Sequence, residues 1–62
     1  MRFPIETERE TDGRWIAEIT DIPGALAYGE TEEAARANVD ALALRIIANQ
    51  VEKFQFRPGV AN

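Results

Sequence analysis

Apolar and polar residues alternate through the first part of the chain. Between residues 2 and 10, the side chains of Phe3, Ile5 and Thr7 fall on one face, and those of Glu6, Glu8 and Glu10 fall on the other. A period of two residues is typical of a strand that buries one face and exposes the other. Residues 2–10 are therefore predicted to form a strand with an acidic, solvated face.

A second alternating run covers residues 14–20 and places Trp15, Ala17 and Ile19 on one face. Asp12-Gly13 lies between the two runs, and an Asp-Gly pair in this position favours a tight hairpin turn. The two strands are therefore predicted to pair antiparallel, with Trp15 on the side of the core.

Residues 21–33 connect the sheet to a helix. Pro23-Gly24 predicts a turn, because proline presets its own φ and glycine accepts a positive φ. Residues 25–28 are apolar and suit a short third strand, which Gly29 ends. The three strands form an antiparallel meander, and its apolar face requires a helix to cover it.

That helix is predicted over residues 31–51. Thr31 suits the N-cap, since its hydroxyl can accept a hydrogen bond from a free helix N–H. Glu32 and Glu33 place negative charge where the helix dipole favours it. One apolar stripe is suited to packing on the sheet and consists of Ala35, Val39, Leu42, Ala43 and Ile46.

The second half of the helix carries another apolar stripe, formed by Leu44, Ile47 and Val51. Beyond it, Phe54 and Phe56 alternate with polar residues, which predicts a short fourth strand over residues 54–57. Chain reversal needs a few residues, and too few separate this strand from the helix for it to fold back. We therefore predict a homodimer in which these five apolar side chains of each copy pack on the other.

Composition narrows the possible functions. The 62 residues suffice for one domain, residues 1–62, and a chain of this size buries only about 60% of its unfolded surface. The chain contains neither cysteine nor histidine, which removes disulfides, Cys-based metal sites and the commonest general base. Its net charge of −4 argues against nucleic-acid binding and suits a basic partner. No signal peptide or membrane-spanning run is visible, so we expect a cytoplasmic protein.

Three short motifs resemble the signature of HicB-type antitoxins. They are Asp12-Gly13-Arg14-Trp15, Asp21-Ile22-Pro23-Gly24 and Tyr28-Gly29-Glu30-Thr31-Glu32-Glu33-Ala34. The motifs match the family in order and spacing, and the resemblance extends over about residues 1–50. It implies a partial ribonuclease H-like fold with the order β-β-β-α-β, in agreement with the predicted elements.

The resemblance also implies a function. Antitoxins of this family bind HicA, a small basic ribonuclease toxin, and block its active histidine. Longer members append a helix-turn-helix or ribbon-helix-helix domain that binds operator DNA, and this sequence ends before any such domain. We therefore expect no specific DNA binding by this chain.

Each candidate partner-binding residue has two interpretations. The face formed by Glu6, Glu8 and Glu10 either meets a basic toxin or is simply solvated. Trp15 either anchors an interface or packs in the core. Tyr28 either reaches a partner through its hydroxyl or is a core residue with a solvated tip.

Asp12 and Asp21 suggest a comparison with metal-dependent nucleases, because ribonuclease H folds hold divalent cations with clustered carboxylates. Both aspartates lie in predicted turns, where Asp is expected for local hydrogen bonding. We therefore expect no catalytic residue, metal or cofactor; RNA turnover that is lost in Asp12→Asn or Asp21→Asn protein would contradict this. The sequence predicts an α+β antitoxin-like module, with a toxin-free interaction domain or a metal-dependent nuclease as alternatives.

Overall fold

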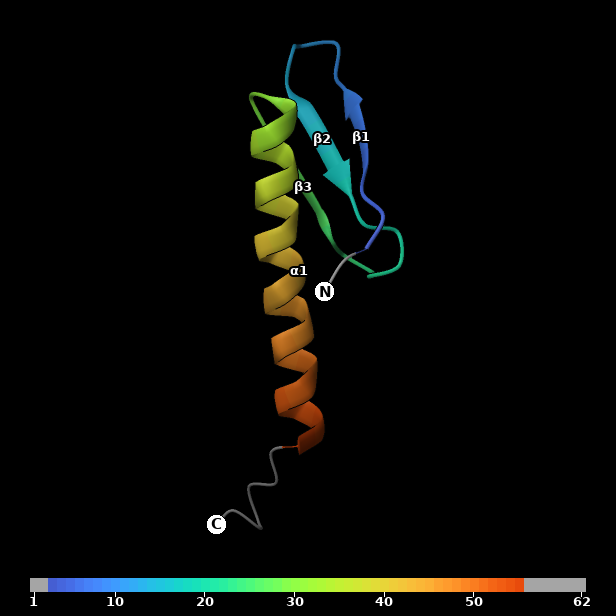
Figure 1. Ribbon diagram of the computed structural model, residues 1–62, viewed down its shortest axis with the longest axis vertical. Helices are drawn as coiled ribbons and strands as arrows, with labels where there is room; N and C mark the ends of the chain where they lie inside the picture. Colours follow the sequence, from blue (N-terminus) through green and yellow to red (C-terminus); the bar gives the residue numbers. More distant parts are fainter. Residues whose placement is uncertain (1–2, 56–62) are drawn as a thin grey trace.

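The computed structural model describes residues 3–55 of the chain. It contains three strands and one helix, which are β1 (Glu6–Arg9), β2 (Trp15–Glu18), β3 (Leu26–Gly29) and α1 (Glu32–Gln55). The strands form one antiparallel sheet in the order β1-β2-β3, and α1 lies against one face of it (Figure 1). The predicted α+β fold, a three-stranded meander packed by one long helix, is therefore confirmed.

The bounds of the elements differ from the predicted ones. Each strand has 4 residues, so the alternating runs over residues 2–10 and 14–20 continue beyond the hydrogen-bonded parts of β1 and β2. β3 is shifted by one residue from the predicted range 25–28 and includes Gly29, which was predicted to end it. The helix is longer than predicted, because it continues through Gln55. Residues 54 and 55 are therefore helical and not part of a strand, while residues 56 and 57 lie outside the described residues. The sequence offers a physical reason, since neither Gly nor Pro occurs between Thr31 and Arg57 to stop the helix.

Both predicted glycine turns adopt the expected backbone conformation. Gly13 has a φ of 95° and Gly24 has a φ of 87°, a region that side-chain-bearing residues rarely occupy. In the first turn, the N–H of Glu10 donates to the carbonyl oxygen of Arg14 at 2.7 Å, which closes the hairpin.

The start of α1 is fixed by side chains as well as by backbone bonds. The N–H of Ala34 donates to Oγ1 of Thr31 at 3.0 Å, so Thr31 is the N-cap, as predicted. Oγ1 of Thr7 donates to a carboxylate oxygen of Glu32 at 2.8 Å, which ties β1 to the first helical turn. Nδ2 of Asn38 donates to the carbonyl oxygen of Tyr28 at 2.7 Å, which holds α1 against the edge strand β3.

Gly29 allows the helix to begin close to β3. A Cβ atom at this position would lie only 2.4 Å from the backbone nitrogen of Ala35 and 2.7 Å from the carbonyl carbon of Ala34. Any side chain at residue 29 would therefore push β3 and the first turn of α1 apart.

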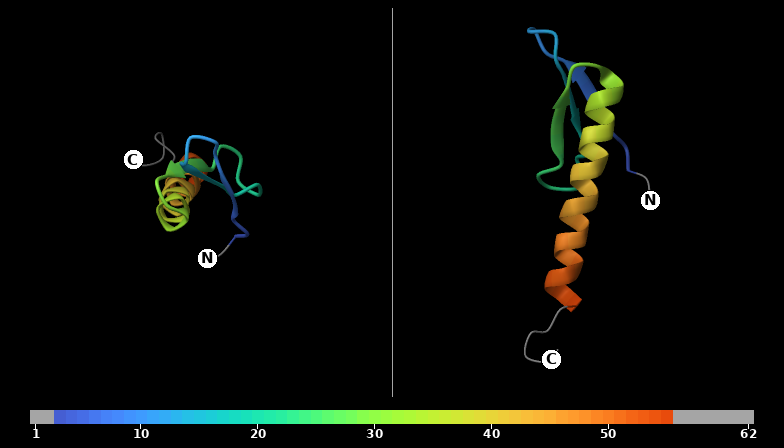
Figure 2. Two further views of the ribbon diagram at one scale, coloured as in Figure 1. Left: turned by 90° about the horizontal axis from the view of Figure 1, so that it is seen from above. Right: turned by 90° about the vertical axis from the view of Figure 1, so that its left-hand side faces the viewer.

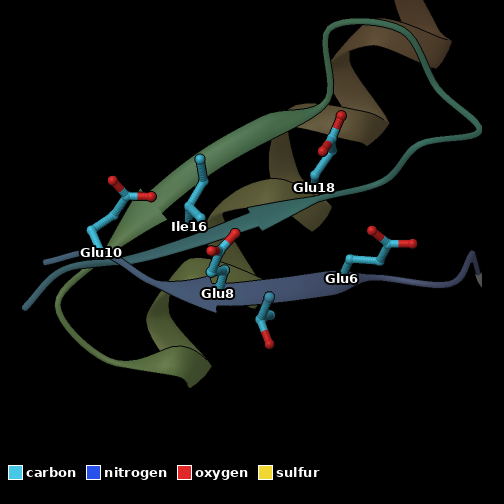
Figure 3. A pocket seen from close by; sticks show the side chains of 6 residues that line it. Glu6, Glu8, Glu10, Ile16 and Glu18 are labelled. Carbon is cyan, nitrogen blue, oxygen red and sulfur yellow. The ribbon is translucent and has the colours of Figure 1, made fainter.

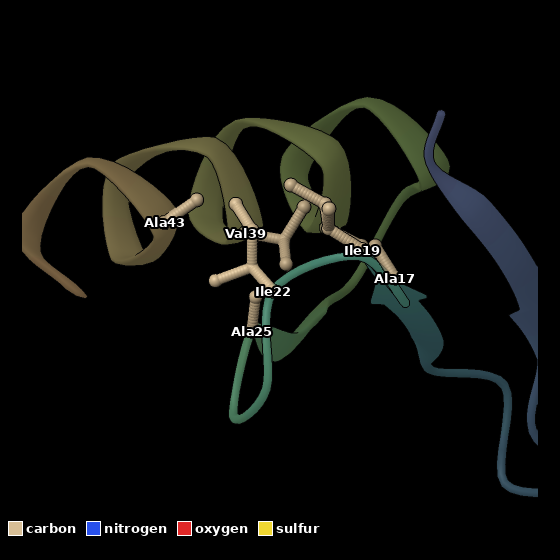
Figure 4. Close-up of a cluster of buried hydrophobic side chains, with 7 residues drawn as sticks. Ala17, Ile19, Ile22, Ala25, Val39 and Ala43 are labelled. Atoms are coloured by element: carbon tan, nitrogen blue, oxygen red, sulfur yellow. The ribbon is translucent and has the colours of Figure 1, made fainter. Parts of the chain in front are cut away.

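The core lies between the sheet and α1 and is built from small side chains (Figure 4). Its buried members are Ala17, Ile19, Ile22, Ala25, Ala35, Val39 and Ala43. Among them, Ile19 and Val39 are the largest that are fully buried. Phe3, Ile5 and Trp15 are partly buried and pack around this cluster.

The helix is much longer than the sheet that it covers. Its 24 residues correspond to about 36 Å at 1.5 Å per residue, whereas a strand of 4 residues spans only about 13 Å. The second half of α1 therefore extends past the sheet (Figures 1 and 2). Among the described residues, no helix combines the length and the apolar character that a membrane crossing requires.

Candidate protein-binding face

The sheet has one face that α1 does not cover, which we call the outer sheet face. Ala17 and Ile19 are buried on the helix side, so their neighbours on β2 point the other way. Strand register arranges this face in two rows, Glu6–Glu18–Leu26 and Glu8–Ile16–Tyr28. Figure 3 views the part of this face formed by β1 and β2, with α1 behind the sheet.

One half of the outer sheet face is acidic. A shallow hollow of about 160 Å³ is lined by Glu6, Glu8, Glu10 and Glu18, together with Thr7 and Ile16 (Figure 3). The ion pairs of residues 3–55 are Asp12–Arg14 and Glu32–Arg36. Among the side chains of residues 3–51, which the structure describes, none forms an ion pair with the four glutamates that line the hollow.

The acidic half contains a like-charged pair in direct register. Glu6 of β1 lies opposite Glu18 of β2. Like charges directly opposite each other on an antiparallel sheet destabilise it, by tenths of a kcal/mol up to about 1 kcal/mol. The sheet therefore retains an arrangement that costs stability when the protein is alone.

The other half of the outer sheet face is apolar. The side chains of Leu26 and Tyr28 on β3 are 40% and 42% exposed, and Ile16 lies half-buried beside them on β2. The guanidinium carbon of Arg14 lies 4.6 Å from the centre of the Tyr28 ring, a distance at which a cation attracts the ring face. The open sheet face therefore places apolar side chains directly beside unpaired carboxylates.

Arg14 is engaged within its own turn. Its backbone N–H donates to one carboxylate oxygen of Asp12 at 3.0 Å, and its Nε donates to the other at 2.9 Å. The backbone bond from Arg14, with the guanidinium beside it, holds the pKa of Asp12 below its ordinary value. Arg14 thus balances the charge of Asp12 and is not paired with a glutamate of the hollow.

The residues predicted to bind a partner separate into two groups. Glu6, Glu8, Glu10 and Tyr28 all belong to the outer sheet face. Trp15 lies on the opposite side and packs against the core cluster, which favours its core interpretation. The predicted partner-binding residues did not include Glu18, Ile16 and Leu26, although the alternation of β2 places Ile16 and Glu18 on the face away from Trp15.

Asp12 and Asp21 do not come together. Asp12 lies in the turn between β1 and β2, and Asp21 lies in the connection between β2 and β3, so the two aspartates are at opposite ends of β2. Across residues 3–55, no group of three or more acidic side chains is arranged to hold a metal ion. The two aspartates therefore cannot share a cation in this fold.

The residues predicted for self-association are also separated by the structure. Leu44 and Val51 are 58% and 44% exposed, whereas Ile47 is half-buried and packs against the core cluster. Ile47 lies at the edge of the sheet-facing side of α1, where it lines a hollow with Phe3 and Ile19. The exposed Leu44 borders the same hollow from its outer side. Phe54 falls within α1 and its side chain is not described, and Phe56 lies outside the described residues.

Comparisons with known proteins identify no relative of this chain. No family model, no curated protein and no solved structure matches the chain. The structure defines its class as a small α+β domain with an open, partly acidic sheet face.

Proposed function

We propose that the chain is an antitoxin-like protein-binding module whose outer sheet face holds a small basic ribonuclease and masks its active site. The observation that carries this proposal is the unpaired acidic hollow beside an exposed apolar strip. An acidic cluster alone would be equally consistent with a solvated strand face. Two features distinguish this surface from an ordinary solvated strand face. It carries the apolar strip, and the like charges of Glu6 and Glu18 lie directly opposite each other.

A cationic side chain of a partner would change the energetics of the acidic half. Placed in the hollow, it would lie between Glu6 and Glu18 and turn their mutual repulsion into two attractions. Such complementary charge mainly accelerates association and excludes acidic partners. The hollow therefore selects for a lysine-rich or arginine-rich protein surface.

The apolar half would supply affinity that does not depend on charge. Leu26 and Tyr28 together with Ile16 offer a continuous surface on β2 and β3. Tyrosine is among the residues that contribute most to protein interfaces, since its ring buries a large area at a small entropic cost. The partner should therefore carry an apolar side chain next to its basic ones.

The identity of the partner rests on the resemblance of the three motifs to HicB-type antitoxins. A HicA-type toxin is small and basic, and an antitoxin that covers its active histidine would stop RNA cleavage. On this proposal both proteins act in the cytoplasm, where the RNA substrate is found. A toxin-free interaction domain would use the same surface for a different basic protein.

The proposal is tested with a purified HicA-type ribonuclease, by measuring how this chain affects its RNA cleavage and how fast the two proteins associate. Glu18→Lys should slow association roughly tenfold at low salt, flatten its salt dependence and weaken inhibition. It should not unfold the sheet, because a lysine would face Glu6 favourably. Glu33→Lys carries the same charge change on an exposed position of α1 and should leave association unchanged.

Three results would count against the proposal. Equal association rates for Glu18→Lys and Glu33→Lys would remove the outer sheet face as the binding surface. If neither the unaltered chain nor either variant inhibited RNA cleavage, the toxin would be excluded as the partner and another basic protein would be favoured. Cleavage of RNA by this chain alone with magnesium would favour the nuclease alternative.

A further inference from the structure

The side of α1 that faces away from the sheet carries a regular apolar stripe, which we call the outer stripe. It consists of Ala37, Ala41, Leu44, Ala48 and Val51, all of them exposed. The steps between successive members are 4, 3, 4 and 3 residues. This spacing averages half a heptad and is typical of the seam between two helices of a coiled coil.

The outer stripe lies opposite the face that the sheet covers. The buried residues Ala35, Val39 and Ala43 mark the sheet-facing side of the same helix. At about 100° per residue, the outer stripe falls on the far side of the helix from them. A helix that is apolar on two opposite sides is normally packed on both, and within residues 3–55 only one side is packed.

The sizes of the side chains in the outer stripe alternate along the helix. From Ala41 to Val51 the order is small, large, small, large, since Leu44 and Val51 alternate with alanines. If two such helices run antiparallel, with the two-fold axis near residue 46, Leu44 of one copy faces Ala48 of the other. Val51 then faces Ala41, so that every large side chain meets a small one.

We propose that the outer stripe pairs with the same stripe of a second copy, in an antiparallel two-helix seam. The pattern is complementary to itself under a two-fold axis, which is the requirement for a closed homodimer. A parallel pairing in register would instead place Leu44 on Leu44 and alanine on alanine, and would leave gaps at the alanines. An unrelated partner would have no reason to match this alternation.

The geometry of the chain permits this seam. The stretch from Ala41 to Val51 spans about 15 Å along the axis of α1, and most of it lies in the second half of the helix, which extends past the sheet (Figure 2). The sheets lie on the far sides of the two helices, so they do not collide. The two outer sheet faces also remain uncovered, so the dimer is independent of the proposed function and would carry two binding faces.

The first experiment measures mass in solution. Light scattering at about 100 μM protein should give twice the chain mass of 6.9 kDa, and Leu44→Glu should reduce it to the mass of one chain. Asn49→Glu introduces the same charge at an exposed position outside the outer stripe and should leave the dimer intact. A monomeric unaltered chain, or a dimer that survives Leu44→Glu, would overturn the proposal.

The second experiment determines the direction of the helices. The chain contains no cysteine, so single substitutions introduce unique thiols for disulfide formation with oxidised glutathione. A mixture of Leu44→Cys and Ala48→Cys proteins should give a cross-linked heterodimer, whereas Leu44→Cys alone should stay largely reduced. Efficient cross-linking of Leu44→Cys alone would instead show a parallel pair and overturn the antiparallel seam. Failure of the mixture to cross-link would also overturn it.

Discussion

Replacing Gly29 by alanine adds a single methyl group at the junction between β3 and α1. The new carbon would lie 2.4 Å from the nitrogen of Ala35, 2.7 Å from the carbonyl carbon of Ala34 and 2.9 Å from the Cβ of Ala34. Two of these atoms belong to the backbone of the first helical turn, so no side-chain rotation relieves the contact. The helix start must move away from the sheet, which disturbs the N-cap and the packing of Ala35.

The magnitude follows from this geometry. Adding a methyl group to a well-packed site costs about 1–3 kcal/mol, and contacts with backbone atoms place Gly29→Ala at the upper end. A domain of this size has a free energy of unfolding of roughly 3–9 kcal/mol, at 0.05–0.15 kcal/mol per residue. A loss of about 3 kcal/mol should lower the melting temperature by roughly 12–24 °C.

Thermal unfolding followed by circular dichroism measures this loss, at one protein concentration because self-association would raise the melting temperature. Gly13→Ala is the matched control, since its Cβ would meet nothing within 4 Å but its φ is 95°. It should cost only about 1–2 kcal/mol, through the backbone conformation alone. If Gly29→Ala melted within a few degrees of the unaltered chain, or above Gly13→Ala, the close approach of helix and strand would not explain the glycine.

Three further predictions concern single side chains. Thr31→Ala removes the N-cap bond and should cost about 1 kcal/mol in urea unfolding, with no change in the slope of the transition. Glu18→Gln relieves the repulsion with Glu6 and should raise stability by about 0.2–1 kcal/mol in the same assay; a loss of stability would contradict the register argument. The pKa of Asp12 is lowered in the folded protein, so its contribution to stability is present above its unfolded pKa of about 3.9 and disappears as the pH falls through the folded value. The difference in urea midpoint between the unaltered chain and Asp12→Asn should therefore shrink as the pH is lowered from 6 to 2. Thr31→Ala is the control, and its difference from the unaltered chain should stay the same over this range.

The parts of the fold that could be predicted from the sequence are those set by interactions between residues close together in the chain. The alternation in β1 and β2, the two glycine turns and the cap at Thr31 all depend on residues close together in the chain. The end of the helix was not predicted, because the alternation of Phe54 with polar neighbours suits a strand as well as the last turn of an amphipathic helix. No glycine or proline distinguishes the two before Pro58.

The candidate sites depended on contacts between distant residues. Strand register places Glu18, Ile16 and Leu26 beside Glu6 and Glu8. A shift of the register by one residue would turn these side chains to the other face of the sheet. Ile47 was predicted to share a stripe with Leu44 and Val51, because helical spacing alone does not show how much of the helix surface the sheet covers. In the structure, the segment before β1 brings Phe3 to the flank of α1, and Ile47 is half-buried there.

The limited core gives both proposed surfaces a common physical basis. Four of the buried core residues are alanines, so each contributes little apolar area, and a short chain has little stability in reserve. If such a domain acts alone, neither the repulsion between Glu6 and Glu18 nor the exposed side chain of Leu44 adds to its stability. A second copy along the outer stripe would add the apolar burial that the core lacks. A basic partner on the outer sheet face would remove the repulsion that the free sheet retains, so the two associations would stabilise the same fold from opposite sides.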